Sequence, residues 1–564
     1  MRKFSFFPIV ALSAIVLSSC SKLDYLTSNN FKTTPTPLES VGGEVSATIN
    51  ATFPKKYMKK KAVITITPVL KYNGGEAQST STTFQGEKVM GNGTTVGYKE
   101  GGNYTMRANF VCTEAMLNSD LLLRFKAKLG NKTVFLPNVK VGYGILATGD
   151  LSRYTLRTAN PALSPDAYQR IIQQKQEAQI KYLVNQATVR SSELKTNSIQ
   201  DFVKILKEIN DNQETLKLQN IEVSAYASPE GRYDFNEKLA EKRQQTSADY
   251  VSQQLKRNKM QADVDTKFTA EDWEGFQQLI SQSNIQDKEI ILRVLSMYQD
   301  PAEREAQIRN MSVVYEDIAK GILPELRRAR LIANYDVIGR SDEQIIMQFE
   351  EDAKELNIEE ILYGATLQNS YIDKKKWYEK ATQLYSNDSR AYNNLANMAY
   401  QIGDLETATN YLQKAKSLNS NNAEVATNEA LIALAKGDIA TAEEKISKGT
   451  GSNAYSEILG NLNLAKGNYA AAAANLIGVN TNSAALAQIL NKDYVSAAST
   501  LEKVKNADAY TEYLKAILSA RKGDTYEMKT ALQNAISQEP NLRARAAKDL
   551  EFSKYESDIK SIIK

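Results

Sequence analysis

The side chains that most often perform catalysis are scarce in this chain of 564 residues. It contains no histidine and only two cysteines, Cys20 and Cys112. Histidine is the commonest general base and metal ligand, so a histidine-activated nucleophile is excluded, and two cysteines cannot form a zinc cluster. The 66 acidic side chains show no spacing that singles out a catalytic pair. We therefore expect no enzymatic activity, no cofactor and no metal site.

Cys20 ends a segment with the three parts of a secretory signal. Arg2 and Lys3 precede an uncharged apolar stretch over residues 4–17, and small residues follow up to the cysteine. The stretch is too short to cross a bilayer comfortably. Leu17-Ser18-Ser19-Cys20 resembles the lipobox of bacterial lipoproteins, which implies removal of a signal peptide over residues 1–19 and attachment of acyl chains such as palmitate to Cys20. Each buried methylene contributes about 0.8 kcal/mol to membrane binding.

The residues after Cys20 bear on location. Ser21 stands where an aspartate would favour retention in the inner membrane of some bacteria, and no acidic run follows that would favour surface export. The resemblance therefore implies a lipoprotein of the outer membrane that faces the periplasm, with exposure on the cell surface as the alternative. A formal charge of +4 over the whole chain gives no reason to expect a nucleic-acid partner.

A second group of residues with recognisable chemistry lies at 221–243. The sequence Ile-Glu-Val-Ser-Ala-Tyr-Ala-Ser-Pro-Glu-Gly over 221–231, followed by Asn236, Leu239 and Arg243, resembles the OmpA-like domain of bacterial envelope proteins. That family's signature is a strand, a glycine turn and a helix with the pattern Asn-x-x-Leu-Ser-x-x-Arg. The resemblance implies non-covalent binding of the diaminopimelate of peptidoglycan, whose ammonium needs an acid and whose carboxylate needs a guanidinium.

The peptidoglycan site carries over only in part. Arg243 and Asn236 occupy the arginine and asparagine positions, whereas Ser228 stands where the family has an aspartate, and Ala240 stands where it has a serine. Glu230 is a candidate substitute carboxylate. Two interpretations stay open. Peptidoglycan binds through these residues, or the fold is retained and Arg243 forms a structural ion pair or binds another partner.

The elements that must position these residues follow from the periodicity between 165 and 345. Strands and amphipathic helices alternate there, which predicts an α/β domain with a β-α-β-α order, and the resemblance implies that this domain is OmpA-like. An insertion around residues 273–315 interrupts the domain. The predicted strands span 180–187 and 221–227, and the predicted helices span 198–210 and 234–255. The resemblance implies a last strand over 329–338.

Two other patterns precede the α/β domain. Residues 20–42 are rich in Ser, Thr, Asn and Pro, which predicts a lipidated flexible tether without a core. Over residues 43–150, apolar and polar residues alternate with a period of two, and glycine-rich turns intervene. This pattern predicts an antiparallel β-sandwich of about seven strands.

Residues 350–564 have the pattern of helical hairpins. The residues at the consensus positions of a tetratricopeptide repeat are Tyr392, Leu395, Ala396, Gly403, Ala408, Leu412 and Ala415. A second copy follows directly, and looser copies continue to Pro540. Small residues let the two helices of a hairpin touch, and a glycine ends the first helix. The resemblance implies an α-solenoid with a concave surface for peptides or protein segments.

Every part with a recognisable pattern is a binding or spacing module. The sequence therefore predicts a multi-domain, lipid-anchored scaffold or assembly factor of the cell envelope. It is expected to bind envelope proteins through its repeats and to contact peptidoglycan through the OmpA-like domain. A surface-exposed adhesin or glycan-binding lipoprotein, with the β-sandwich as its binding domain, is the alternative.

Overall fold

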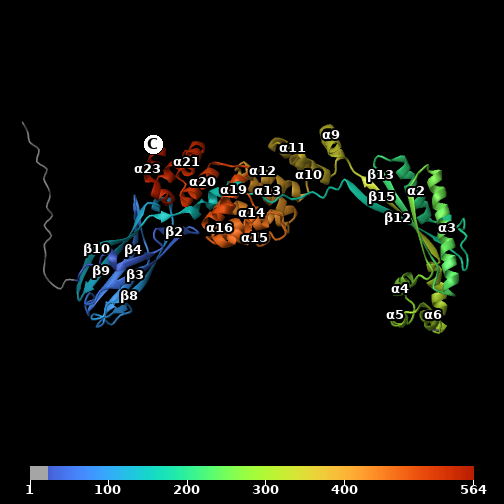
Figure 1. The fold of residues 1–564 in the computed structure, drawn as a ribbon, viewed down its shortest axis with the longest axis horizontal. Coiled ribbons are helices and arrows are strands. Elements are labelled where there is room, and N and C mark those ends of the chain that lie inside the picture. Colours follow the sequence, from blue (N-terminus) through green and yellow to red (C-terminus); the bar gives the residue numbers. More distant parts are fainter. Residues whose placement is uncertain (1–22, 311, 564) are drawn as a thin grey trace, which may run out of the picture. The chain divides into compact units, whose positions relative to one another are not determined.

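The computed structural model describes residues 23–310 and 312–563, so the predicted lipidation site at Cys20 lies outside the described residues. The described residues form two compact units: residues 23–165 together with 368–563, and residues 166–367 (Figure 1). The N-terminal strands and the C-terminal helices therefore belong to one unit, and the α/β region is inserted between them in the sequence. Within the described residues, no helix is both long and apolar enough to span a membrane.

The first unit begins with a β-sandwich of two sheets. One sheet has the order β1-β3-β2-β11, with β8 paired to β3, and the other has the order β10-β9-β4-β6-β7, with β5 paired to β4. Alternate residues of β3, such as Val45, Ala47 and Ile49, are buried between the sheets. The strands are β1 (Phe31–Thr34), β2 (Leu38–Val41), β3 (Glu44–Phe53), β4 (Ala62–Tyr72), β5 (Gly75–Gln78), β6 (Thr82–Gly86), β7 (Thr94–Val96), β8 (Gly102–Val111), β9 (Ser119–Leu129), β10 (Lys132–Tyr143) and β11 (Ile145–Leu146).

The sandwich is larger than the sequence predicted. Residues 31–41, predicted to be part of a tether, form β1 and β2 instead, and Leu38 is 1 % exposed. Residues 31–34 pair antiparallel with residues 48–51 of β3. The tether prediction was wrong because Ser and Thr suit a half-buried strand as well as a flexible segment. Five strands of the described sandwich have four residues or fewer, which is too short to show a period of two.

The C-terminal part of the first unit consists of helix pairs, as predicted. The alanines expected where the helices of a hairpin touch, such as Ala408, Ala442 and Ala497, are fully buried. Gly403 follows the first helix of its pair with a φ of +80°, the left-handed conformation that favours glycine. The pairs are α12 (Ser389–Gln401) with α13 (Leu405–Leu418), α14 (Ala423–Ala435) with α15 (Ile439–Ile446), α16 (Tyr455–Ala465) with α17 (Tyr469–Asn475), α18 (Asn482–Leu490) with α19 (Tyr494–Glu502), and α20 (Ala509–Lys522) with α21 (Thr525–Gln538). The helix α11 (Tyr371–Leu384) precedes them, and α22 (Leu542–Ala546), η7 (Leu550–Tyr555) and α23 (Glu556–Ile562) follow.

The sandwich packs directly against the helix pairs. A Cβ atom at Gly42, in the turn between β2 and β3, would lie 2.9 Å from the main-chain oxygen of Lys466 at the end of α16. Arg545 Nη2 donates a hydrogen bond of 3.0 Å to the carbonyl of Ala147, just after β11. These contacts explain why the two parts form one compact unit.

The second unit contains a four-stranded sheet with the order β12-β15-β13-β14. β13 and β14 are parallel, and the other neighbours are antiparallel. Helices α2 (Asn197–Asp211) and α3 (Tyr233–Arg257) cover one face, where Phe202 and Val251 pack against alternate strand residues such as Val223. The strands are β12 (Ile171–Lys181), β13 (Leu216–Tyr226), β14 (Asp263–Thr269) and β15 (Arg328–Ile338). The further helices are α4 (Trp273–Gln282), α5 (Lys288–Met297), α6 (Pro301–Asn310), α7 (Ser312–Gly321), α8 (Leu323–Leu326), α9 (Asp342–Asp352) and α10 (Ile358–Leu367).

The predicted β-α-β-α order is confirmed, with one displaced strand. The strand predicted over 180–187 is wrong in its bounds, because β12 covers 171–181 and pairs with β15 along its whole length. Ile171 and Ile172 are 56 % and 42 % exposed, so main-chain pairing rather than burial holds this half of the strand. The predicted insertion folds into helices α4 to α7, with a small core that includes Phe276 and Ile291.

Candidate functional site

The first helix of each pair contributes to one face of the repeats, and this face binds a segment of the same chain. The segment comprises residues 148–165 and is called the groove segment below. It contains η3 (Thr148–Leu151), α1 (Ser152–Thr155) and η4 (Leu156–Thr158), followed by an extended stretch up to Pro165. The groove segment contacts α20 and α18 near its start and α12 near its end. It therefore crosses all five pairs.

Asparagine side chains hold the main chain of the groove segment at Ala162, which is fully buried. The carbonyl of Ala162 accepts hydrogen bonds from the Nδ2 atoms of Asn393 (2.9 Å), Asn397 (2.8 Å) and Asn428 (2.8 Å). The N–H of Ala162 donates to Asn428 Oδ1 at 2.7 Å. Because both main-chain polar groups are satisfied by side chains, α12 and α14 replace the strand partner that an extended segment otherwise needs.

Two further residues of the groove segment are held in the same way. Ser164 exchanges two hydrogen bonds with Asn394, from its N–H at 2.9 Å and to its carbonyl at 3.0 Å. Asn160 donates from its N–H and its Nδ2 to the carboxylate of Glu457, at 2.8 and 3.0 Å. These contacts recognise main-chain atoms at alternate residues, which is the spacing of an extended peptide.

The earlier half of the groove segment is held mainly through side chains. Tyr154 stacks on Tyr510, with ring centroids 4.9 Å apart and an angle of 7° between the planes. Arg157 forms an ion pair of 2.8 Å with Glu539, and its guanidinium lies over the Tyr510 ring. Thr155 Oγ1 lies 2.9 Å from Ser483 Oγ in a buried contact. This half therefore supplies sequence-specific contacts, whereas the Ala162 half supplies main-chain contacts.

Burial changes the acid–base behaviour of two groups along the groove. Burial raises the pKa of the Glu457 carboxyl, although the two hydrogen bonds from Asn160 oppose that shift. Burial also raises the pKa of Tyr510 to about 12, with a further contribution from Glu539. The tyrosine is therefore neutral at physiological pH, and Glu457 is the group whose titration is coupled to docking of the groove segment.

The sequence predicted a peptide-binding surface on the repeats, but it did not identify the side chains or the occupant. The signal available in the sequence was a set of asparagines in the segments that form α12 and α14. Asn393, Asn394, Asn397 and Asn428 are at most 5 % exposed, and buried asparagines need partners. The partners lie at least 230 residues earlier in the chain, which no local pattern can show.

The residues predicted for the OmpA-like site lie together in the second unit, at the end of β13 and the start of α3. Ser228 Oγ donates to Glu230 Oε1 at 2.8 Å, and Asn236 Nδ2 donates to the carbonyl of Glu230 at 3.1 Å. Glu230 also accepts from Nε and Nη2 of Arg327, at 3.0 and 2.7 Å. The candidate carboxylate is therefore already paired with a guanidinium.

Arg243 is 1 % exposed and binds main-chain carbonyls. Its Nε, Nη1 and Nη2 atoms donate to Gln186 (2.9 Å), Tyr226 (2.9 Å) and Leu183 (3.2 Å). The guanidinium also lies over the Tyr182 ring, 5.1 Å from its centroid. Burial lowers the pKa of Arg243 to about 10. The side chain thus joins α3 to the loop after β12, and a ligand carboxylate would have to compete with these three acceptors.

The inserted helices also reach this cluster. The main-chain N–H of Gly231 donates to Glu305 of α6 at 2.9 Å. Arg328, next to Arg327, forms a buried ion pair of 3.0 Å with Asp272, the residue that caps α4. The insertion therefore packs against the turn that the sequence identified as the candidate ligand loop.

Together the fold and the groove define a multi-domain protein with an α-solenoid of helix pairs that holds an extended peptide segment on one face. No protein-family model matches the chain, and no curated protein matches it. Among solved structures, it is similar to a tetratricopeptide repeat protein from Parabacteroides merdae, with 15 % identity, a TM-score of 0.27, and coverage of 46 % of this chain and 98 % of that chain.

Two further solved structures are similar to this chain. A chain of the APC/C hetero-tetramer Cut9-Hcn1 is 11 % identical, with a TM-score of 0.29 and coverage of 59 % of this chain and 67 % of that chain. Yeast Tom70 is 13 % identical, with a TM-score of 0.24 and coverage of 65 % and 84 %. The helix pairs of this chain itself, rather than these likenesses, define its repeat region.

Proposed function

We propose that this protein is a lipid-anchored scaffold or assembly factor of the bacterial cell envelope that binds partner proteins through its helical repeats. The proposal rests on the contacts at Ala162, where four asparagine contacts hold both main-chain groups of an extended segment. A surface that binds main-chain atoms in this way is a peptide-binding surface in chemical terms. It performs no catalysis in this proposal.

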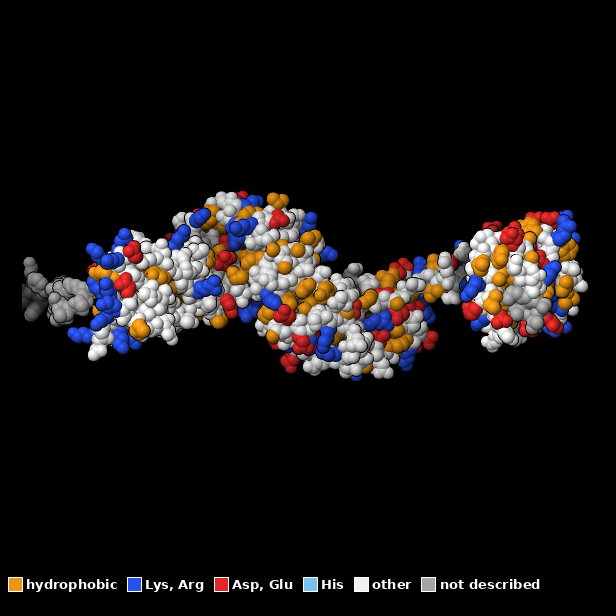
Figure 2. All heavy atoms as spheres, turned by 90° about the horizontal axis from the view of Figure 1, so that it is seen from below, with side chains coloured by type: hydrophobic (Ala, Val, Ile, Leu, Met, Phe, Trp, Pro, Cys, Tyr) orange, Lys and Arg blue, Asp and Glu red, His pale blue; other side chains and the backbone are white. Residues whose placement is uncertain are grey.

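The groove segment determines where partners bind. A partner peptide either displaces the groove segment or binds to the outer helices, where Val495 and Tyr526 are 83 % and 76 % exposed. On the visible face of the first unit, apolar side chains lie scattered among charges of both signs (Figure 2). Partner contacts on such a surface combine small apolar patches with polar contacts.

In-cell crosslinking tests the scaffold proposal. A photoreactive amino acid is placed at Leu163 in the groove segment, at Val495 or at Tyr526, and the adducts are identified by mass spectrometry. Adducts with envelope proteins at Val495 or Tyr526 would indicate that partners bind to the outer helices. Adducts at Leu163 would indicate that partners bind in the groove. If none of the three positions captures an envelope protein, the scaffold proposal is wrong.

The lipid anchor rests on the sequence of residues 2–20, which lie outside the described part of the chain. Metabolic labelling with a palmitate analogue tests it. We expect label on the natural protein and on Cys112→Ala, and none on Cys20→Ala. Cys112 is a matched control because the chain has two cysteines in total. Equal labelling of both variants would contradict the anchor.

Peptidoglycan contact is a separate part of the proposal. It is supported by the grouping of Ser228, Glu230 and Asn236 at the end of β13 and the start of α3, although Glu230 is paired with Arg327. Binding of a zwitterionic ligand end would require this ion pair to open. Co-sedimentation with purified sacculi is expected for the natural protein and reduced for Glu230→Gln. Equal sedimentation of both, or of neither, would exclude a contact through Glu230.

The membrane face is tested by adding protease to whole cells. An envelope scaffold that faces the periplasm is protected, so the repeats should remain intact until the outer membrane is permeabilised. Degradation of the repeats on intact cells would instead favour the surface adhesin or glycan-binding lipoprotein.

A further inference from the structure

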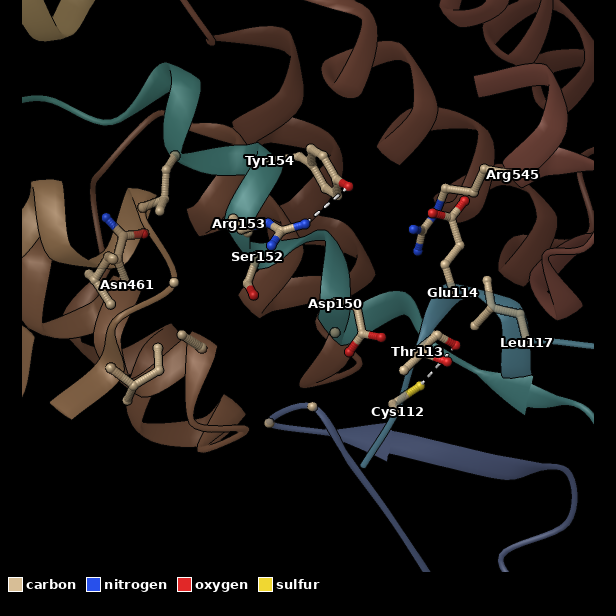
Figure 3. A pocket seen from close by; sticks show the side chains of 18 residues that line it. Cys112, Thr113, Glu114, Leu117, Asp150, Ser152, Arg153, Tyr154, Asn461 and Arg545 are labelled. Atoms are coloured by element: carbon tan, nitrogen blue, oxygen red, sulfur yellow. Dashed lines mark hydrogen bonds between the residues drawn. The ribbon is translucent and has the colours of Figure 1, made fainter. Parts of the chain in front are cut away.

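A cavity of about 400 Å³ lies where the sandwich, the groove segment and the helix pairs meet, all within the first compact unit. Its wall comes from the β2–β3 turn, from Cys112 to Leu117, from α1, and from the ends of α14 and α16. Figure 3 shows Asn461 on one side of this cavity and Arg545 with Glu114 on the other. The volume is within the range of small-ligand sites, about 300–1,000 Å³.

Asn461 distinguishes this cavity from an ordinary gap between packed parts. Its side chain is 2 % exposed and lines the cavity, and neither its Oδ1 nor its Nδ2 has a hydrogen-bond partner among the described residues. Leaving both halves of a buried amide unpaired is unfavourable, so such a group needs an explanation. A ligand that supplies one acceptor and one donor would satisfy both atoms.

The position of Asn461 in its helix indicates what that ligand is. Asn461 lies in α16 at the position that Asn397 occupies in α12, counted back from the glycine that follows each helix, Gly467 and Gly403. Asn397 donates to the main-chain carbonyl of Ala162. The same side chain at the same repeat position therefore already recognises a peptide group in this molecule.

The charges around the cavity favour a neutral ligand. The charged side chains of the lining are two acids, Glu114 and Asp150, and two arginines, Arg153 and Arg545. Asp150 Oδ1 already accepts from Ser40 at 2.8 Å, and Arg545 Nη2 already donates to the carbonyl of Ala147. Since the formal charges cancel, the cavity offers no net attraction to an anion or a cation. Leu434 and Ile439 add apolar surface to the lining.

We infer that this cavity binds a short uncharged peptide segment, whose main-chain amide pairs with both side-chain atoms of Asn461. It is a second peptide site beside the groove segment, and residues 149–156 of that segment form part of its wall. The inference is independent of the lipid anchor and of the envelope location, so failure of either leaves it standing.

Binding of a defined probe to the purified protein tests the inference. The probe is N-acetyl-diglycine amide, and titration is followed by ligand-observed NMR. We expect binding that weakens by about tenfold or more in Asn461→Leu, because leucine has a similar size but cannot pair with the amide. Asn421→Leu, the same change on an exposed loop between helix pairs, is expected to leave binding unchanged.

A second variant keeps the test valid if Asn461→Leu fails to fold. Ser152→Phe fills the cavity from α1 and leaves Asn461 in place, so it should also abolish binding. Sodium acetate serves as a charged competitor and should not displace the probe. The inference is overturned if the natural protein does not bind the probe at millimolar concentration, if acetate competes with it, or if neither variant weakens binding.

Discussion

Replacing Asn428 with leucine should loosen the groove segment while the helix pairs stay folded. Asn428 accepts from the N–H of Ala162 at 2.7 Å, and its Nδ2 lies within 2.9 Å of the Ala162 carbonyl and of the side-chain oxygens of Asn393 and Asn397. Leucine fits a similar volume but offers no polar atom. The substitution therefore removes one acceptor and one donor group from the centre of the asparagine cluster.

The expected loss of docking free energy follows from the polar groups that the substitution leaves unpaired. The N–H of Ala162 is fully buried and loses its acceptor, and a buried unpaired group costs about 1–3 kcal/mol. Asn393 and Asn397 each lose a donor to their side-chain oxygen, although both still donate to the carbonyl of Ala162. We expect docking of the groove segment to weaken by about 3 kcal/mol in total, which corresponds to roughly 100-fold more frequent opening.

Amide hydrogen exchange, measured by mass spectrometry, checks this prediction. The informative groups are the N–H of Ser164, held by Asn394, and the N–H of Asn160, held by Glu457, since neither bond involves Asn428. Both should exchange roughly 100-fold faster in Asn428→Leu and at the natural rate in Asn421→Leu. If Ser164 and Asn160 keep their natural exchange rates in Asn428→Leu, the asparagine cluster does not hold the segment and the reasoning fails.

Three further predictions concern stability. In the absence of ligand, Asn461→Leu should raise the thermal stability of the first unit by about 1–3 kcal/mol, because it removes an unpaired buried amide; a lower melting temperature would contradict this. Arg243→Lys should destabilise the second unit by about 3 kcal/mol, because one ammonium cannot reach all three carbonyls, and an unchanged melting temperature would show that Arg243 is not structural. The raised pKa of Glu457 means that the folded state binds a proton more tightly than the unfolded state. Stability of the natural protein relative to Glu457→Gln should therefore fall as the pH rises from the usual carboxyl range through the raised pKa, and a difference that is constant with pH would exclude this coupling.

The sequence predicted those parts of the fold in which burial of one face produces a periodic pattern of apolar residues. Val45, Ala47 and Ile49 alternate because one face of β3 is buried, and Ala408 and Ala442 recur because helices touch there. The exposed first half of β12 carries no such pattern, since its pairing with β15 depends on main-chain atoms that every residue has.

The candidate sites were predictable to a smaller extent. Motif spacing located Ser228, Glu230, Asn236 and Arg243, and the structure brings these residues together. Motif spacing could not show that Glu230 pairs with Arg327 or that Arg243 binds main-chain carbonyls, because both contacts involve segments far away in the chain. The groove segment was missed for the same reason.

The long separation between the groove segment and its asparagines has a consequence for the order of assembly. Ala162 and Asn428 are 266 residues apart, so the segment precedes its partner helices wherever the chain emerges from its N-terminal end. The second unit lies entirely within that interval and can fold first. Its folding replaces a long flexible loop with a compact body, which reduces the entropy lost when the loop closes. The inserted unit would thus help its host close around the segment.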